Sequence, residues 1–344
     1  MKNKFFITFK IKLILIGISI LFCGSTIAQT LNGSFESKFK RYQKNESFAG
    51  TQSQNWSTIA WKGDRIHKQL LLWSSSNING LSYTISNLVK GADQINASNI
   101  KLRFGQYIKG DPDARSCSAY PTHPSFVEIV DALSDETVTS ITATDPLKLW
   151  LTIDVPSATS IGVYTGTITV NGGATPLIFN ISVNVVDYTL PNVANWDFHL
   201  DLWQFPTKVL DHYNSANPSS KITTWSDQHF DLFEPGYRIL ADMGQKAIAA
   251  QIKENALGMP SMIRWIRKTN GNWEYDFTAF DKYVTKLMSW GINKQIDCFS
   301  PVGWNEDEIP YWDEATNSMK NLNAAIGSST YNTRWNHFLT AFKT

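Results

Sequence analysis

Through the first half of the chain, hydrophobic and polar residues alternate in short runs that turn residues separate. Clear examples lie at residues 70–73, 82–85, 100–107, 126–130 and 147–153. An alternation with a period of two places successive side chains on opposite faces of a β-strand. Five or more such strands without a convincing helix are typical of an antiparallel β-sandwich. We therefore expect a sandwich domain over residues 29–190.

The clearest pair of strands lies near the end of this region, at residues 164–170 and 177–186. Asn171-Gly172-Gly173 follows the first strand, and glycine supplies the positive φ that a tight hairpin turn requires. Residues 145–170 are also similar to the paired strands of an immunoglobulin-like module. The predicted first domain is therefore an immunoglobulin-like antiparallel β-sandwich.

The pattern changes after residues 188–192, which we interpret as a linker. A helical spacing follows in Phe230, Phe233, Tyr237 and Leu240. Ser226 is a candidate N-cap and Gly244 a candidate stop for this helix. Pro235 lies inside the pattern and predicts a kink or two short helices. Residues 246–252 then form an apolar run that predicts a buried strand.

Residues 261–276 are predicted to form a hairpin inserted after that strand, because Asn270-Gly271 lies in the middle of the segment. A two-residue turn at this point sets the register of the two strands. The predicted register pairs a cation with an acid and a cation with an indole ring, namely Arg267 with Glu274 and Lys268 with Trp273.

Two more helices and one more strand follow. Asp276 can cap a second helix that ends at Gly291, with Phe280, Val284 and Leu287 facing inward. Residues 295–300 predict a third strand, and residues 301–326 a long loop rich in tryptophan and acid. The third helix is capped by Ser328 or Ser329 and carries Tyr331, Trp335, Phe338 and Phe342.

Alternating strands and helices are typical of parallel βα units. A closed (β/α)8 barrel needs eight units and about 250 residues, whereas residues 191–344 hold only three. The segment is either a small open α/β domain or an incomplete (β/α)8 TIM-type barrel, and we expect the incomplete barrel. The helical pattern still continues at Thr344, so the sequence predicts a fragment that is inactive and poorly folded, with an unpaired hydrophobic strand edge.

The first of the three predicted strands carries the candidate site. Within residues 195–206, a period of two places Phe198, Leu200 and Leu202 on one face, which is expected to pack on helices. His199, Asp201 and Trp203 alternate with them, and Gln204 follows. In a βα barrel, polar residues near the carboxyl end of a strand point into the active-site mouth. An ordinary amphipathic strand with a hydrogen-bonded His-Asp pair explains the pattern equally well.

Composition and charge narrow the function classes. A formal net charge of +1 gives no support for binding to nucleic acid. The 13 tryptophans are compatible with stacking on sugar rings, although core packing also accounts for tryptophan. The histidines and cysteines show no metal-binding spacing, so no metal or other cofactor is expected.

The N-terminus is typical of a secretory signal peptide. Lysines precede an apolar run at residues 13–22, and small residues lie ahead of a cut after Ala28. The run is shorter than the roughly 20 residues of a membrane-spanning helix. Cys23 raises the alternative of a lipoprotein anchor, which the bulky Phe22 disfavours. We expect residues 1–28 to be removed and the protein to be periplasmic or extracellular. Only Cys117 and Cys298 then remain, which is too few cysteines for a disulfide scaffold.

Several segments of the chain resemble glycoside hydrolase family 123, a family of exported β-N-acetylgalactosaminidases. They are D-F-H-L-D-L-W-Q (197–204), W-S-D-Q-H-F-D-L (225–232), L-A-D-M-G-Q-K (240–246), W-E-Y-D-F-T-A-F-D-K-Y-V (273–284) and G-I-N-K-Q-I-D-C-F-S (291–300). The stretch Y-T-G-T-I-T-V near residue 165 is similar to the family's β-sandwich. The resemblance covers most of the chain after the signal peptide.

The resemblance implies a β-sandwich followed by a (β/α)8 barrel that removes terminal N-acetylgalactosamine with retention. It also implies a substrate-assisted mechanism, in which the 2-acetamido oxygen attacks the anomeric carbon. One carboxylate polarises the acetamido group, and a neighbouring acid protonates the leaving oxygen. The family's consecutive Asp-Glu pair is expected beyond Thr344. The acids at residues 306–308 and 313–314 are interpreted as solvated loop residues, so no catalytic residue is assigned.

Six residues are carried over as candidates for substrate binding: His199, Asp201, Trp203, Gln204, Ser300 and Trp304. The expected partner is a glycan, with a terminal N-acetylhexosamine, and the oligomeric state stays open. Two alternatives remain. One is a non-catalytic carbohydrate-binding or degenerate relative. The other is a different barrel glycosidase that uses Asp201 with a loop acid as a conventional carboxylate pair.

Overall fold

The computed structural model describes residues 29–110, 127–302 and 307–343. The chain divides into two compact units, residues 1–190 and residues 191–344. The predicted signal peptide, Cys117 and Trp304 lie outside the described residues. Within the described residues, no helix has the length and apolar character needed to cross a membrane.

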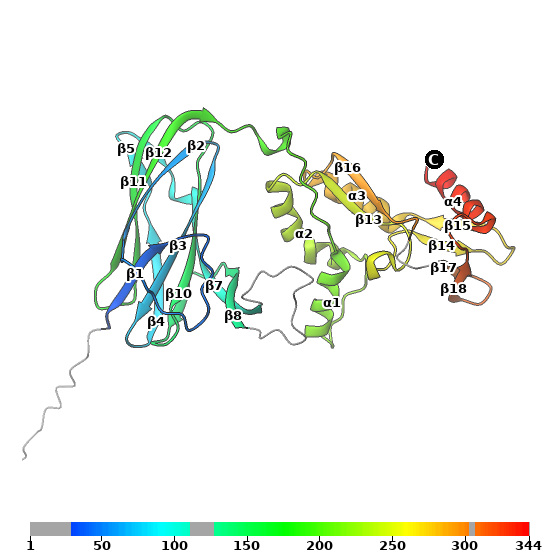
Figure 1. The fold of residues 1–344 in the computed structure, drawn as a ribbon, viewed down its shortest axis with the longest axis horizontal. Helices are drawn as coiled ribbons and strands as arrows, with labels where there is room; N and C mark the ends of the chain where they lie inside the picture. Colours follow the sequence, from blue (N-terminus) through cyan, green and yellow to red (C-terminus); the bar gives the residue numbers. More distant parts are fainter. Residues whose placement is uncertain (1–28, 111–126, 303–306, 344) are drawn as a thin grey trace, which may run out of the picture. The chain divides into compact units, whose positions relative to one another are not determined.

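The described part of the first unit consists of two β-sheets (Figure 1). One sheet has the order β1-β3-β10-β7-β8, with bounds Leu31–Glu36, Arg65–Ser74, Leu147–Asp154, Ile100–Gly110 and Val127–Ser134. The other has the order β2-β12-β11-β4-β9, with bounds Asn55–Lys62, Leu177–Thr189, Gly162–Asn171, Ile78–Ile85 and Val138–Ile141. The short strands β5 (Leu88–Lys90) and β6 (Asp93–Ile95) extend the second sheet, and a 3-10 turn, Ala97–Asn99, precedes β7.

The two sheets enclose one hydrophobic core. Leu70 and Leu72 from β3 share it with Phe179 and Val183 from β12. In β12, buried residues alternate with more exposed ones, as expected for a strand with one face on the core. The predicted hairpin of β11 and β12 is confirmed, and Gly172 after β11 has φ +131°. The all-antiparallel expectation was wrong at one place, because β2 pairs with β12 in parallel.

A buried lysine fastens the segment that connects β1 to β2. The Lys148 ammonium donates to the carbonyl oxygens of Pro146 (3.0 Å) and Gln43 (3.1 Å), and it also bonds the Tyr107 hydroxyl. Lys148 is 1% exposed. Burial lowers the pKa of Lys148 to about 8. The first unit therefore keeps a cation inside, surrounded by backbone acceptors.

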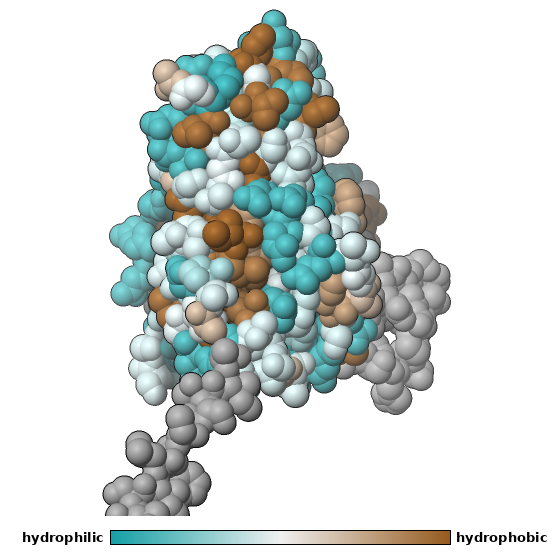
Figure 2. Space-filling view, turned by 90° about the vertical axis from the view of Figure 1, so that its left-hand side faces the viewer, coloured by the Kyte–Doolittle hydropathy of each residue, from teal (hydrophilic) through white to brown (hydrophobic). Residues whose placement is uncertain are grey.

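Hydrophobic and hydrophilic side chains are interspersed on the face of the molecule that Figure 2 shows. On the seven-stranded sheet, Ile59, Val163 and Ile178 are at least half exposed. Ile59 and Val163 flank Asn184 in one row of this sheet, and exposed apolar side chains are normal on protein surfaces. They therefore carry no functional assignment.

In its described residues, the second unit combines four α-helices with two small sheets. The helices are α1 (Pro206–Ala216), α2 (Asp227–Asp242), α3 (Thr278–Ser289) and α4 (Ser329–Phe342). One sheet is the parallel pair β13 (Ala247–Gln251) and β16 (Gln295–Phe299). The other has the order β15-β14-β17-β18, with bounds Trp273–Asp276, Arg264–Arg267, Glu308–Asp313 and Ser318–Asn323. Short 3-10 turns lie at Val193–Asn195 and Ala256–Gly258.

Aromatic residues hold this unit together. Phe233 of α2 and Tyr283 of α3 belong to one core with Ile248 and Ala250 of β13. In the same core, the ring of Phe338 on α4 stacks on Trp265 of β14 with centroids 4.6 Å apart. Figure 1 shows α2 and α3 beside β13, and α4 beside β14 and β15. The helices therefore cover one face of each sheet.

The predicted helix boundaries are confirmed at most positions. The Ser226 hydroxyl accepts a hydrogen bond from the His229 amide (3.3 Å), and that of Ser328 accepts one from the Tyr331 amide (3.1 Å). Gly244 and Gly291, which follow α2 and α3, both have positive φ. The helix α2 continues through Pro235 as one element, so two short helices do not form.

The predicted strand at residues 195–206 was wrong in extent. Its only bridge joins Leu200 to Gln245 in parallel, and the following residues are irregular until α1 begins. Phe198 is 67% exposed and Leu202 is 42% exposed. The face that was expected to pack on helices is therefore largely in solvent.

Two hairpins also differ from expectation. In the first, Arg267 pairs with Trp273, because a three-residue loop with Gly271 at φ +84° replaces the predicted two-residue turn. Consequently Lys268 forms an ion pair with Glu274 at 3.8 Å. The cation over the Trp273 ring is Arg334, at 4.8 Å. In the second, the predicted loop at 301–326 contains β17 and β18, paired antiparallel.

Candidate functional site

Parallel strands β13 and β16 end at the same edge of their sheet. Their register places Ala249 beside Asp297 and Gln251 beside Phe299. Ile248 and Ala250 belong to the core with the helices, so the alternating residues lie on the opposite face. We call this opposite face the inner face and define it by Gln251, Asp297 and Phe299. In open and closed α/β sheets alike, ligands bind at the carboxyl edge of parallel strands.

Trp203 reaches the inner face. Its indole meets the ring of Phe299 edge to face, with centroids 5.3 Å apart and an interplanar angle of 67°. Trp203 nevertheless stays 54% exposed, so part of its surface is free to contact a ligand. The next residue after Phe299 is Ser300, whose hydroxyl donates to the Val302 carbonyl at 2.7 Å. The structure therefore brings Trp203 to the end of β16, and Ser300 shapes the loop that follows.

The side-chain amide of Gln204 forms hydrogen bonds with the backbone of β13, in place of the backbone bonds of a neighbouring strand. Its Oε1 accepts from the Ala249 amide at 2.7 Å, and its Nε2 donates to the Ala247 carbonyl at 3.3 Å. The side chain of Gln245 does the same for the backbone of Leu202, at 2.9 and 3.1 Å. Two glutamine amides thus hold this segment beside β13. The amide of Gln204 is buried and engaged with the strand, which leaves it a positioning role.

His199 and Asp201 are exposed. Neither side chain has a hydrogen bond or ion pair with another residue of the described ranges, so the hydrogen-bonded His-Asp pair of the simpler interpretation does not form. Binding of substrate by His199, Asp201, Trp203, Gln204 and Ser300 stays a prediction.

Gln251 and Asp297 are site residues that the sequence pattern did not predict. Gln251 is 1% exposed, and neither atom of its side-chain amide has a hydrogen-bond partner within the described residues. Buried polar groups are normally hydrogen-bonded, so this amide marks a position where a ligand or water is expected. Asp297 accepts from Gln295 Nε2 at 2.6 Å. The available signal was the polar residue that ends the apolar run A-I-A-A-Q.

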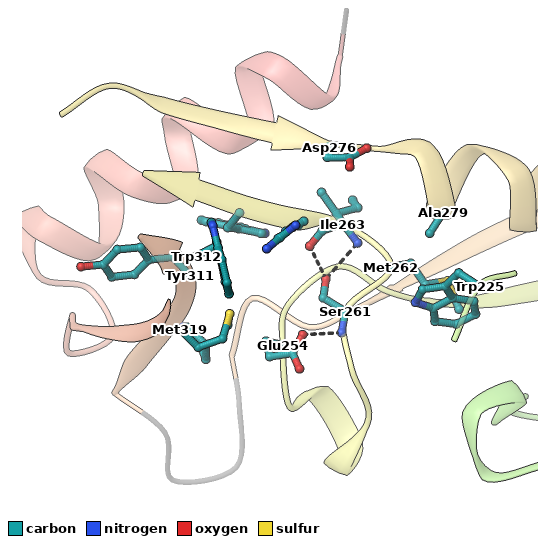
Figure 3. A pocket seen from close by; sticks show the side chains of 13 residues that line it. Trp225, Glu254, Ser261, Met262, Ile263, Asp276, Ala279, Tyr311, Trp312 and Met319 are labelled. Atoms are coloured by element: carbon teal, nitrogen blue, oxygen red, sulfur yellow. Dashed lines mark hydrogen bonds between the residues drawn. The ribbon is translucent and has the colours of Figure 1, made fainter. Parts of the chain in front are cut away.

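A pocket of about 310 Å³ opens next to the end of β13 (Figure 3). We call it the rim pocket. It is lined by Trp225, Glu254, Ser261, Met262, Ile263, Arg264, Trp265, Asp276, Ala279, Pro310, Tyr311, Trp312 and Met319. The Met262 amide donates to the Gln251 carbonyl at 2.8 Å, which connects the pocket wall to the inner face.

Charged and aromatic groups line the rim pocket. The Arg264 guanidinium lies over the Trp312 ring at 4.2 Å, and the two residues come from the two hairpins. Glu254 Oε2 accepts from the Ser261 amide at 2.7 Å, while burial raises the pKa of the Glu254 carboxyl. Hydrogen bonds from Thr278 lower the pKa of Asp276. Asp276 was expected to cap α3, but Phe277 holds the N-cap position, and Asp276 accepts from the amide of the first helical residue.

Trp225, at the other end of the rim pocket, is held by a buried histidine. Its backbone has φ +64°, a left-handed conformation that few non-glycine residues adopt. The Trp225 amide donates to Nδ1 of His229 at 3.1 Å, so Nε2 carries the proton and donates to the Pro206 carbonyl at 3.1 Å. Burial lowers the pKa of His229. A neutral imidazole thus fixes Trp225.

The sequence pattern predicted that the acidic pair Asp313-Glu314 lies in a solvated loop, and this prediction was wrong. Asp313 ends β17, is 6% exposed and is paired with Lys320. Glu314 Oε1 lies 2.5 Å from the Lys268 ammonium. These lysine contacts lower the pKa of both carboxyls. Carboxylates held ionised in this way are poorly suited to general-acid catalysis.

Within the described ranges, no three His, Cys, Asp or Glu side chains are grouped so as to hold a metal ion. Cys298 is a free, partly buried thiol whose pKa is raised by burial. The described groups at the carboxyl edge of the parallel sheet are aromatic faces, an amide and a carboxylate.

Comparison with known proteins identifies the family. Residues 203–344 match the model of the glycoside hydrolase 123 catalytic domain, and residues 33–172 match that of the glycoside hydrolase 123 N-terminal domain. A solved family 123 glycoside hydrolase from Clostridium perfringens, studied for glycolipid glycan hydrolysis, is 25% identical with a TM-score of 0.79. The alignment covers 91% of this chain and 55% of that enzyme, so the chain spans about half the length of this relative.

Other solved structures are much less similar. AvmM, which catalyses macrocyclization in alchivemycin A biosynthesis, has a TM-score of 0.26 at 5% identity, over 48% of this chain and 92% of that one. A β-glucosidase from Listeria innocua has a TM-score of 0.21 at 10% identity, over 47% of this chain and 17% of that one. Neither value supports a shared fold, and a search of curated proteins gave no match. On its two domain matches and the Clostridium enzyme, the chain belongs to glycoside hydrolase family 123.

Proposed function

We propose that the protein is an exported glycoside hydrolase that removes terminal N-acetylgalactosamine from glycans, with β13 and β16 as strands of a (β/α)8 barrel and the first unit as an immunoglobulin-like sandwich. The inner face carries the proposal. There Trp203, Phe299, Gln251 and Asp297 gather at the carboxyl edge of two parallel strands. The family match and the glycolipid glycan activity of the Clostridium enzyme support a glycan substrate.

In this proposal the described residues bind and orient the sugar. The exposed part of Trp203 provides a flat apolar surface for a pyranose ring. The Gln251 amide has a donor and an acceptor to offer to the acetamido group or a hydroxyl of the substrate. The substrate-assisted mechanism of the family needs an acid and an acetamido-polarising carboxylate. No residue of this chain is assigned to either role.

Hydrolysis of p-nitrophenyl N-acetyl-β-D-galactosaminide by the full-length protein tests this proposal, with the N-acetylglucosaminide and the galactoside as comparison substrates. We expect release of p-nitrophenol from the N-acetylgalactosaminide at the highest kcat/KM, with retention visible in the anomer first formed. Trp203→Ala is expected to raise KM about tenfold through the lost stacking surface. Faster hydrolysis of another glycoside would refute the N-acetylgalactosamine assignment, and glycan binding without turnover would favour a non-catalytic relative.

The alternative conventional carboxylate pair has less support. It requires Asp201 together with a loop acid that can donate a proton, but Asp313 and Glu314 are both paired with lysines. Asp201→Asn in the full-length protein tests it directly. We expect turnover to fall less than tenfold, whereas loss of a nucleophile or general base lowers it by several orders of magnitude.

A further inference from the structure

The rim pocket is separate from the inner face. Its lining comes from the starts of α2 and α3, from the loop after β13 and from the two hairpins, and it includes none of Trp203, Gln251, Asp297 or Phe299. The two are nevertheless neighbours, since Met262 of the pocket wall bonds the carbonyl of Gln251. A ligand bound at the inner face therefore has a second cavity beside it.

The lining of the rim pocket combines the groups that recognise a sugar. Trp312 and Trp225 provide aromatic rings at its two ends (Figure 3). Glu254 and Asp276 provide carboxylate acceptors for hydroxyl groups, and Arg264 provides donors. Within the described residues the Arg264 guanidinium has no ion pair. It lies over the Trp312 ring, and its charge contributes to the lowered pKa of Asp276, its neighbour across the hairpin, while its N–H groups are available to a ligand.

The charge of the lining favours an uncharged ligand. Two carboxylates, Glu254 and Asp276, outnumber the single guanidinium of Arg264. An anionic sugar, such as a sialylated or sulfated unit, meets this excess of negative charge and is repelled. A volume of about 310 Å³ lies at the small end of ligand pockets. The pocket therefore suits a small neutral group with several hydroxyls.

We propose that the rim pocket is a second sugar subsite, which takes a neutral hexose unit of the same glycan whose terminal sugar occupies the inner face. This inference rests on the proposed function for the link between the two sites. Arg264 and Trp312 are its specificity-determining residues: the stacked pair presents a hydroxyl-binding edge and an apolar surface from two different hairpins. A glycan with a second sugar unit is then expected to bind more tightly than a p-nitrophenyl glycoside, which has no sugar to place in the rim pocket.

Binding of lactose to the chain tests the proposal without any hydrolysis, by ligand-observed NMR and calorimetry. We expect binding in the millimolar range, weakened about tenfold by Arg264→Ala and by Trp312→Ala. Trp312→Phe keeps an aromatic face and is expected to retain most of the affinity. The matched control is Trp61→Ala, a 44% exposed tryptophan of the first unit, which is expected to leave binding unchanged.

Arg264 is exposed, so Arg264→Ala is expected to fold even if Trp312→Ala does not. Unchanged lactose binding in folded Arg264→Ala would overturn the proposal, and so would tighter binding of 3′-sialyllactose than of lactose. Hydrolysis separates the two claims. Lactose binding that depends on Arg264 supports the subsite, whether or not the full-length protein hydrolyses an N-acetylgalactosaminide. Absence of that hydrolysis would refute only the proposed function.

Discussion

The cores of the two units use different chemistry. Leucine, isoleucine and valine fill the space between the sheets of the first unit, for example Leu70, Ile168 and Val183. Rings dominate the second, where Phe233, Tyr283 and Phe338 lie at the centre. Aliphatic side chains pack well on pleated sheets, whereas large rings fill the wider spaces between helices and small sheets and add edge-to-face contacts.

The units also treat buried polar groups differently. In the first unit the ammonium of Lys148 is surrounded by acceptors. In the second, Thr207, Gln251 and the indole N–H of Trp335 are buried without a hydrogen-bond partner in the described residues. Unsatisfied buried groups lower stability. Ser76 Oγ of the first unit is also buried without a partner, so within the described residues the difference is one of degree. Of the three groups named in the second unit, only Gln251 ends a strand.

The largest expected effect is on the aromatic core. Phe338→Ala removes a ring that is 0% exposed and stacked on Trp265, and it is expected to lower the free energy of unfolding of the second unit by about 4 kcal/mol. Tryptophan fluorescence during urea unfolding measures this change. Phe39→Ala, at an 85% exposed position, is the matched control and should alter stability by less than about 0.5 kcal/mol. A loss below about 1 kcal/mol in Phe338→Ala would show that α4 does not depend on this contact.

A second effect concerns the buried cation of the first unit. The pKa of Lys148 is about 8 in the folded protein and 10.5 ordinarily. Between these values the unfolded chain binds more protons, so stability rises with pH. We expect the free energy of unfolding to increase by about 1.5 kcal/mol from pH 8 to pH 9.5 through this group. Near pH 10 the gain ends, because burial raises the pKa of Tyr42 and Tyr107 and holds both neutral in the folded state.

Lys148→Met isolates this contribution. The variant retains an unbranched apolar side chain but cannot titrate. Its unfolding free energy is expected to be flatter over the same pH range, as urea titrations at each pH would show. Equal slopes for the variant and the original protein would mean that the ammonium of Lys148 is as well solvated by its carbonyl partners as it is by water.

A third prediction tests whether polar groups in the second unit can also be structural. Gln204→Ala removes the acceptor of the buried Ala249 amide. We expect a loss of about 1 kcal/mol and about five- to tenfold faster hydrogen exchange at Ala249. Gln204→Glu keeps the acceptor and is the control, with a smaller change at this amide. If the Ala249 amide exchanges at the original rate in Gln204→Ala, the ladder does not depend on the side chain.

Elements whose signals are local could be predicted from the sequence. Ser226 and Ser328 cap helices because a hydroxyl accepts from an amide three residues ahead. The hairpin of β11 and β12 likewise follows from its flanking alternation and glycine turn. Such features depend on a few neighbouring residues, so the pattern contains them.

Other features depend on distant partners and could not be predicted. The alternation at residues 195–206 favoured a strand. In the structure, however, backbone groups of the neighbouring β13 form hydrogen bonds with the side chains of Gln204 and Gln245 and not with a backbone ladder. The register of β14 and β15 is set by the length of the loop between them, which is one residue longer than predicted. Of the candidate site, Trp203 lies against Phe299 at the end of β16, and its contact with a substrate stays a prediction. Whether the buried amide of Gln251 has a hydrogen-bond partner is decided by residues that are distant in sequence, so the pattern could not show that it has none within the described residues.

The smallest expected effect separates structural from catalytic acids. Glu314 bonds Lys268 and the Thr269 amide, and its side chain is 36% exposed. Surface ion pairs of this kind contribute little, so Glu314→Gln is expected to lower stability by less than about 1 kcal/mol. Its kcat in the full-length protein should change less than twofold, because a carboxylate held ionised by lysine has no proton to donate. The same test on Asp313→Asn should give a larger stability loss, since that carboxylate is buried. A fall in kcat by several orders of magnitude in folded Glu314→Gln would contradict this prediction. It would show that a residue of the hairpin of β17 and β18 takes part in catalysis, outside both the inner face and the rim pocket.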